Sequence, residues 1–186
     1  EALVYYQKAL ALRIKNLGEG HSDTSFSYYD MGEYYRVLQE YGAALQYYQK
    51  ALRIQECLYG ETSYYICDTY NAMAKVFVVQ KQYQKALKNL EKSLKIRLKT
   101  NGAYHPRTAK SYNQLAVYLQ MRYYDRALEY YEKAIVANNS FDKKGSFDFN
   151  QCLDKHVLLA TLYGKAKVLQ ERSKEKENVL VDNLVA

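Results

Sequence analysis

A sequence repeat with a period of 42 residues limits the folds that are open to this chain. One glycine marks each period, and Gly18, Gly60 and Gly102 follow one another at this interval. The hexapeptide YYQKAL at 5–10 recurs unchanged at 47–52. Periods of about 20–50 residues are typical of stacked repeat architectures, in which each unit buries its apolar face against the next. We therefore expect an array of similar units.

Within each period the apolar residues recur at spacings of three and four, which is the spacing of one face of an α-helix. Tyr28 and Met31 lie on such a face in the first complete period. The position after Met31 is small in every period, and its residues are Gly32, Ala74 and Ala116. A larger side chain there would push the partner helix away. A second amphipathic helix follows, so each period predicts a pair of helices.

The order of these residues, aromatic-x2-Leu/Met-Gly/Ala-x2-aromatic and then Ala-x3-aromatic, resembles the signature of tetratricopeptide repeats (TPRs). The 42-residue form is similar to the TPRs of kinesin light chains, and to the TPR arrays that precede CHAT caspase-like peptidase domains in bacterial proteins. HEAT and armadillo repeats have a similar period but lack the small residue of the signature. The positions that fit the longer form are Arg53, Gly102, His105, Pro106 and Thr108.

The resemblance implies an all-α fold, a right-handed TPR solenoid of antiparallel helix pairs. It covers residues 1–138, which we interpret as the second helix of a truncated repeat followed by three full repeats. Residues 139–149 are polar and predict a loop. Residues 150–186 predict a degenerate pair of capping or junction helices, and within them the run at 158–169 resembles the helix pair between TPRs and a CHAT domain. The helical pattern is already under way at Glu1, so we expect a longer natural chain.

Composition and charge argue against several classes of protein. No run of 18 apolar residues occurs, so we predict no membrane span. The net charge of +7 would suit an acidic partner. However, lysine and glutamate are interspersed, for instance at 174–177, which argues against a nucleic-acid surface. The cysteines are few and far apart, which favours reduced thiols and a cytoplasmic location.

One pair of residues has the spacing of a catalytic dyad. Cys152 and His156 lie four residues apart on one predicted helix face, but neither a glycine-rich loop nor a strand accompanies them to form an oxyanion hole. The 22 tyrosines would offer a base-stacking surface, but the core pattern accounts for about half of them. We therefore predict no enzyme and no cofactor.

Two histidines occupy equivalent places, each shortly after a repeat glycine. Because His21 and His105 are two repeats apart, they cannot converge on one metal ion. We interpret them as loop residues before a helix, with Asp23–Thr24 and Arg107–Thr108 as candidate caps. We predict no metal site.

The resemblance also implies a concave groove lined by the first helix of each repeat. An asparagine in this groove often contacts the backbone of a bound peptide in the family, and Asn71 and Asn113 match it, whereas Tyr29 replaces it in the first complete repeat. An amide suits this role because it both donates and accepts hydrogen bonds. The expected groove residues are Tyr29, Glu33, Arg36, Asp68, Asn71, Lys75, Lys110, Asn113 and Gln120.

We therefore expect a scaffold that binds a protein or peptide, acidic where it meets Lys75 and Lys110, or an adjacent domain of the same chain. Two alternatives follow from the resemblance: a non-catalytic regulatory arm of a CHAT peptidase, and a cargo adaptor similar to kinesin light chains. A further interpretation is a solvated groove without a ligand of its own. The residues do not distinguish among them.

Overall fold

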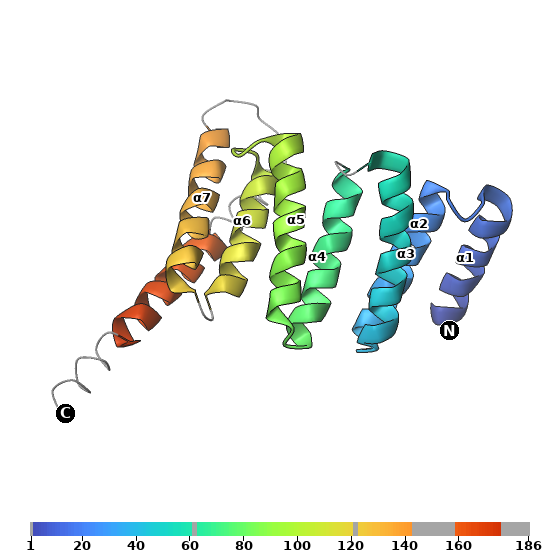
Figure 1. The fold of residues 1–186 in the computed structure, drawn as a ribbon, viewed down its shortest axis with the longest axis horizontal. Helices are drawn as coiled ribbons and strands as arrows, with labels where there is room; N and C mark the ends of the chain where they lie inside the picture. The colour runs from blue at the N-terminus through green and yellow to red at the C-terminus, as the bar shows by residue number, and fades with distance from the viewer. Residues whose placement is uncertain (1, 61–62, 121–122, 143–158, 176–186) are drawn as a thin grey trace. The chain divides into compact units, whose positions relative to one another are not determined.

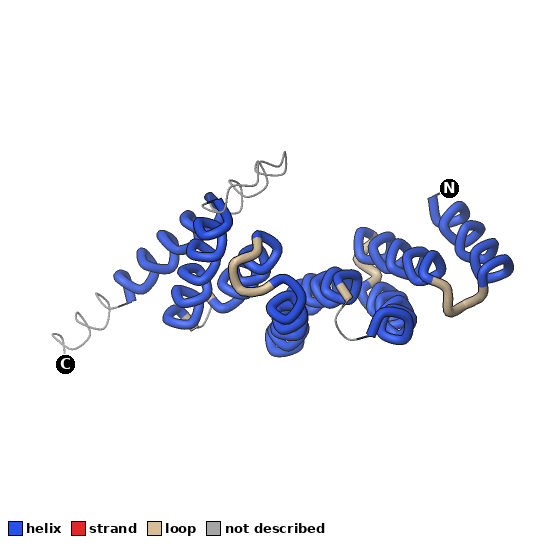
Figure 2. The backbone as a smooth tube through the Cα atoms, turned by 90° about the horizontal axis from the view of Figure 1, so that it is seen from above, coloured by secondary structure: helices blue, strands red, loops and turns tan. Residues whose placement is uncertain are grey.

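The described part of the chain consists of helices joined by short loops and contains no strand (Figures 1 and 2). None of its helices combines the length and hydropathy that a membrane span needs. The chain divides into two compact units, Glu1–Thr100 and Asn101–Ala186. The structure, a computed structural model, describes residues 2–60, 63–120, 123–142 and 159–175.

In the first unit each helix packs on its neighbour in sequence. α1 packs on α2, α2 on α3 and α3 on α4, and hydrogen bonds join α4 to α5. α1 has no buried residue and packs on α2, the helix that follows it. That α1 is the second half of a truncated repeat stays a prediction. The helices are α1 (Ala2–Leu17), α2 (Ser22–Val37), α3 (Tyr41–Tyr59), α4 (Tyr64–Val79) and α5 (Tyr83–Asn101).

The second unit contains α6 (Pro106–Leu119), which packs on α7 (Tyr124–Asp142), and a further helix at 159–175. This last helix lies within the region that the sequence predicts to be helical. The other residues of the predicted capping pair, including Cys152 and His156, lie outside the described part of the chain.

The end of α7 differs from the sequence prediction. Residues 139–142 belong to the helix, although the sequence placed them in a loop. The prediction was wrong because Asn and Ser weaken a helix by only about 0.5–0.7 kcal/mol each and do not by themselves end one. The remainder of the predicted loop, 143–149, is not described.

The turns inside the α2–α3 and α4–α5 pairs are each closed by a residue with a positive φ angle. Gln39 has a φ of 63° and Lys81, 42 residues later, a φ of 58°. After α2, the amide of Glu40 donates to the carbonyl of Tyr35 over 2.9 Å, and that of Gln39 donates to Arg36 over 3.1 Å. These two bonds form a Schellman motif, which satisfies carbonyls that the helix end leaves free.

The turn between successive pairs is also repeated, and here the structure corrects the assignment of the caps. The Nδ1 atom of His21 accepts a hydrogen bond from the amide of Asp23 over 3.1 Å, and that of His105 accepts one from Arg107 over the same distance. Ser63 takes the equivalent place in the second repeat. The histidines themselves are therefore the N-caps, since an imidazole nitrogen can accept from an amide two residues ahead. Asp23–Thr24 and Arg107–Thr108 are not the caps.

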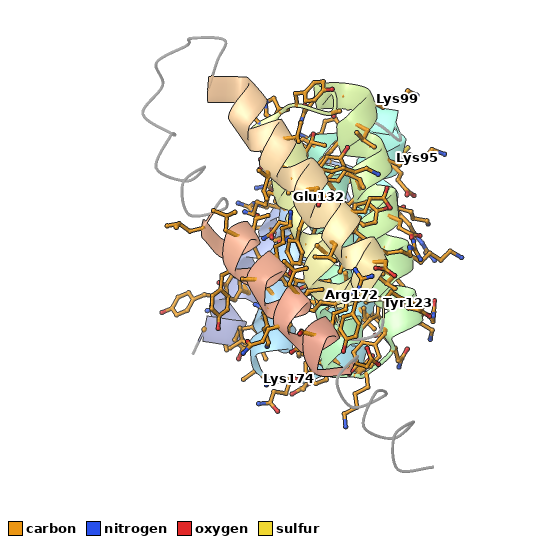
Figure 3. The ribbon with its side chains drawn as sticks, turned by 90° about the vertical axis from the view of Figure 1, so that its left-hand side faces the viewer. Lys95, Lys99, Tyr123, Glu132, Arg172 and Lys174 are labelled. Atoms are coloured by element: carbon orange, nitrogen blue, oxygen red, sulfur yellow. The ribbon has the colours of Figure 1, made fainter. Side chains whose placement is uncertain are left out.

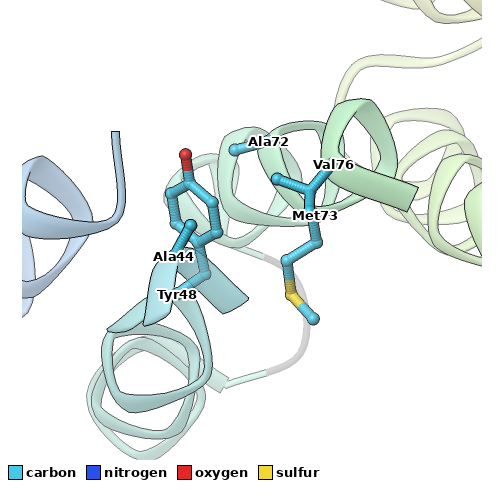
Figure 4. Packing of buried hydrophobic residues seen from close by; sticks show 5 residues of the cluster. All are labelled: Ala44, Tyr48, Ala72, Met73 and Val76. Atoms are coloured by element: carbon cyan, nitrogen blue, oxygen red, sulfur yellow. The ribbon is translucent and has the colours of Figure 1, made fainter. Parts of the chain in front are cut away.

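The core of the first unit forms around Tyr48. This side chain of α3 is fully buried and lies beside Ala72 and Met73 of α4 (Figure 4). On the other side it contacts Gly32 of α2, where an added Cβ would come within 2.6 Å of the ring. The small residue of the repeat signature thus makes room for an aromatic ring from the second helix, as the sequence pattern predicts.

Two polar contacts are buried among these apolar residues. Between α3 and α4, Thr69 donates a hydrogen bond to Oε1 of Gln55 over 2.8 Å, and Gln55 is 1% exposed. Within the next pair, Arg97 of α5 donates to Oδ1 of Asp68 over 3.1 Å, and Arg97 is 5% exposed. In each of these two contacts a buried polar side chain thus has a partner on the neighbouring helix.

Candidate functional site

The predicted groove residues of the first unit lie on α2 and α4. On α2, Arg36 binds the carboxylate of Glu33 with two nitrogens, at 2.7 Å from Nη2 and 3.2 Å from Nε to Oε2. The hydroxyl of Tyr48 also donates to Glu33. Glu33 is thus fully engaged within the protein, and its charge is neutralised by Arg36.

The pKa of Glu33 reflects these contacts. Burial alone would raise it, but the hydrogen bonds from Arg36 and Tyr48 and the nearby charges of Arg36 and Lys75 hold it below its ordinary value. Glu33 therefore stays ionised at neutral pH. The influence of Lys75 also shows that the predicted groove residues of α4 lie near those of α2.

Tyr29 lies between the groove residues of α2 and those of α4. Its ring lies 5.6 Å from that of Tyr48. Burial, together with the negative charges of Glu33 and Asp68, raises the pKa of Tyr29 to about 12. Because Asp68 belongs to α4, the structure brings predicted residues of two successive repeats together on one face. The carboxylate of Asp68 is bound by Arg97, which leaves Lys75 as the exposed charge of this face without an ion pair in the described residues.

Asn71 differs from its neighbours on this face. It is only 8% exposed, and its side-chain oxygen has no hydrogen-bond donor among the described residues. A buried acceptor without a donor costs about 1–3 kcal/mol. The oxygen itself is shielded from solvent, so a donor from outside the chain would reach it only after the Asn71 side chain turns outward.

The three predicted groove residues of the second unit are Lys110, Asn113 and Gln120, and their contacts differ from those of Asn71. Oδ1 of Asn113 accepts a hydrogen bond from Thr161 over 3.0 Å, and Oε1 of Gln120 accepts one from the hydroxyl of Tyr131 over 2.9 Å. Lys110 is exposed. The oxygens of Asn113 and Gln120 are thus occupied by partners within the unit, unlike that of Asn71.

The partner of Asn113 belongs to the helix at 159–175, which packs on α7 within the second unit. Gly164 lies against the ring of Tyr131, and an added Cβ would collide with it. Figure 3 shows this helix beside α7. Two ion pairs join the two helices. They are Lys165–Glu132 at 3.1 Å and Arg172–Asp125 at 3.0 Å.

Sequence reasoning missed Thr161, although a signal was present. Asn71 precedes the small residue Ala74 by three positions, and Thr161 precedes Gly164 by the same interval. The helix at 159–175 therefore takes the place of the first helix of another repeat, with Thr161 at the asparagine position. Tyr48 was assigned only to the core, and its hydroxyl contact with Glu33 could not be read from spacing.

Comparisons with known proteins agree with this fold. The family model for the tetratricopeptide repeat matches residues 1–56 and 65–136. No curated protein matches the chain significantly.

Several solved structures resemble the chain. BtubC (BKLC) from P. vanneervenii is 22% identical, with a TM-score of 0.69, and the match covers 96% of this chain and 73% of that one. A putative kinesin light chain with nearly identical TPR-like repeats from Podosopora anserina is 19% identical, with a TM-score of 0.70, over 92% of this chain and 78% of that one. The Sgt2 TPR domain from Aspergillus fumigatus is 19% identical, with a TM-score of 0.54, over 82% of both chains.

These matches show the fold, and they confirm the all-α TPR solenoid that the repeat pattern predicted. The resemblance to kinesin-light-chain-type repeats is confirmed as well. The resemblance to arrays before CHAT domains stays a prediction. Since the family model covers most of the sequence, the chain belongs to the tetratricopeptide repeat family, whose members generally act as protein-interaction scaffolds.

Proposed function

We propose that this chain binds a segment of another protein on the face formed by α2 and α4, with Asn71 as the central contact. The observation that carries the proposal is the buried, unpartnered oxygen of Asn71. An extended peptide has backbone N–H groups that need acceptors. Once the Asn71 side chain turns outward, one such group would bind its oxygen and remove the cost of leaving it unpaired.

The charges around Asn71 set the character of the bound segment. Glu33 is neutralised by Arg36, and Asp68 by Arg97, so the remaining exposed charge on this face is Lys75. An acidic side chain of the partner is therefore favoured close to Lys75. Because such a pair is exposed, it contributes only about 0.2–1 kcal/mol and weakens with salt.

Two finer functions fit the same surface. A cargo adaptor is favoured by the similarity in fold to a putative kinesin light chain. A regulatory arm of a CHAT peptidase, acting on an adjacent domain of its own chain, rests on the sequence resemblance alone. Determining the complete gene separates them, since further repeats or a coiled coil would favour the adaptor and a strand-rich domain with His and Cys the peptidase. Both functions imply a cytoplasmic protein without a cofactor.

The proposal is tested with peptides selected from a random display library for binding to the chain. We expect Asn71→Ala to weaken the selected peptides by about threefold to tenfold, because one net hydrogen bond is worth about 0.5–1.5 kcal/mol. Fluorescence anisotropy titrations measure the change. Thermal unfolding should show that the variant still folds, since no bond to the Asn71 oxygen is lost within the chain.

Asn113→Ala is the matched control. Its oxygen is already bound by Thr161, so this variant should change peptide affinity less than Asn71→Ala does. The proposed site is wrong if selected peptides bind Asn71→Ala with unchanged affinity.

A further inference from the structure

A second surface, away from Asn71, is marked by charge. Five lysines of α5 follow one another at spacings of three and four, which places them in one line along the helix. All five are exposed, and Lys95 and Lys99 project from α5 into solvent (Figure 3). The five, which we call the lysine stripe, are Lys85, Lys88, Lys92, Lys95 and Lys99.

Little negative charge balances the lysine stripe. Glu91 is the single acidic residue of α5, and no salt bridge joins a stripe lysine to an acidic side chain among the described residues. Like charges at these spacings repel one another and weaken the helix. The lysine stripe is therefore a region of positive potential that acidic side chains of the described residues do not neutralise.

The internal repeat shows which of these lysines the fold requires. Lys92 has an equivalent in α3, Lys50, and both amines lie over tyrosine rings, at 5.1 Å from Tyr70 and 5.3 Å from Tyr28. This lysine is part of the helix packing. By contrast, Lys88 corresponds to Gln46 in α3, so the same fold forms without a charge there.

Two further stripe positions give the same result, since Lys85 corresponds to Ala43 in α3 and Lys99 to Cys57. Lys95 corresponds to Arg53, so this position is positive in both helices. Three of the five stripe charges are thus a property of this one repeat and not of the architecture.

A hollow of about 420 Å³ lies beside the stripe, between α3 and α5. Its apolar lining comes from Ile66 and Tyr70 of α4 and Ile96 of α5. Three stripe lysines surround it, and Glu56 of α3 lies in it, where it accepts a hydrogen bond from the hydroxyl of Tyr70 over 3.1 Å. A cavity of this size admits a bulky apolar side chain.

We propose that the lysine stripe and this hollow form a docking surface for an acidic segment of a partner protein, which places one apolar side chain in the hollow. The stripe extends over about 21 Å at 1.5 Å per residue, the length of about four helical turns. The apolar lining favours a protein over a nucleic acid, whose phosphates would gain nothing from it. The carboxylate of Glu56 in the hollow also disfavours a phosphate there.

This surface is independent of the proposed peptide site. Tyr70 lines the hollow and Asn71 is its neighbour in α4, and adjacent residues of a helix point about 100° apart. One helix would thus present two faces to two segments, or to two parts of one partner. The inference does not rest on the proposed function of the α2 and α4 face.

The test uses a fluorescein-labelled 16-residue peptide with glutamates at spacings of three and four and a phenylalanine at its centre. We expect the wild-type chain to bind it with an affinity that falls as salt rises. The triple variant Lys88→Gln/Lys95→Gln/Lys99→Gln should bind about tenfold more weakly. It should still fold, since glutamine is a good helix former and the change relieves repulsion. A peptide with serine in place of phenylalanine should also bind more weakly.

The matched control removes the same charge elsewhere, as Lys8→Gln/Lys15→Gln/Lys174→Gln, where all three lysines are exposed. This control, and Asn71→Ala, should change the affinity for the acidic peptide by less than twofold. Equal losses in both triple variants would show that net charge alone attracts the peptide and would overturn the proposal. Tighter binding of a DNA duplex, or of vesicles rich in phosphatidylserine, than of the acidic peptide would overturn it as well.

Discussion

Gly32 and Tyr48 show how closely two helices of a repeat approach. An added Cβ at Gly32 would lie 2.6 Å from two carbons of the Tyr48 ring. The ring is fully buried, and its hydroxyl donates to Glu33. It is therefore held at both ends and cannot move aside without losing contacts on α4.

Replacing Gly32 with alanine should lower the free energy of unfolding by about 1–3 kcal/mol through overpacking, even though alanine favours a helix by about 1 kcal/mol over glycine. Gly42 is the control, because it lies in α3 with open space around its Cα. Gly42→Ala should raise stability by about 0.5–1 kcal/mol. Urea unfolding measures both, and equal shifts of the two variants would contradict the assigned packing.

For single residues, the sequence predicted which helix face a residue occupies better than it predicted the hydrogen bonds that the residue makes. The small residues Gly32 and Ala74 follow from periodicity, because a helix places them on a known face. The difference between Asn71 and Asn113 does not follow, because it depends on Thr161, 48 residues beyond Asn113 in the chain. Hydrogen bonds between distant side chains depend on rotamers that spacing does not reveal.

Among the elements, the turns between α2 and α3 and between α4 and α5 carry backbone strain. Gln39 and Lys81 adopt the left-handed region, which costs a residue with a Cβ about 1–2 kcal/mol. Glycine adopts this region without the penalty. Repetition of the same conformation at the same place shows that the turn geometry, and not the residue, is what the repeat preserves.

Gln39→Gly should therefore raise the free energy of unfolding by about 0.5–1 kcal/mol, as the relief of strain exceeds the added entropy of the unfolded chain. Gln46→Gly makes the same replacement at an exposed site inside α3. It should lower stability by about 0.5–1 kcal/mol. Thermal melts of the two variants should move in opposite directions, and a fall in both would show that the turn is not strained.

Helix existence and order were predictable because 42-residue periodicity is strong, whereas helix ends were not. α7 continues through Asn139 and Ser140, where polar composition indicated a loop. Polarity indicates exposure to solvent and does not end a helix. The N-caps were missed for a similar reason, since His21 is a less usual cap than the Asp and Thr that follow it.

Across the whole molecule, tyrosine supplies much of the buried surface. Burial raises the pKa of Tyr131 to about 12. The pKa of Tyr28 rises to about 12 through burial and its hydrogen bond to Glu19, and that of Tyr48 rises further. A phenol whose pKa is higher in the folded chain keeps its proton there, so its stabilising effect is complete below pH of about 10 and is lost as the pH rises toward 12.

Stability should therefore fall steeply with pH above about 10, the ordinary pKa of tyrosine. Tyr29→Phe should make this fall shallower, because one phenol with a pKa of about 12 is removed. Tyr5→Phe, at a site that is 71% exposed, should leave the slope unchanged. Urea unfolding at several pH values gives the slopes, and an unchanged slope for Tyr29→Phe would contradict the assignment.

The buried contacts of Arg97 and Gln55 have a consequence for how the chain finds its native pairing. These residues occupy equivalent positions, 42 apart, on two helices that share the same apolar repeat pattern. If α5 paired with α2 in place of α4, Arg97 would meet Phe26 instead of Asp68 and would be buried without that charge partner. Breaking a buried ion pair costs about 3–5 kcal/mol. The polar contacts thus distinguish one copy from another, and they discourage misfolding by helix exchange within a chain or between two chains.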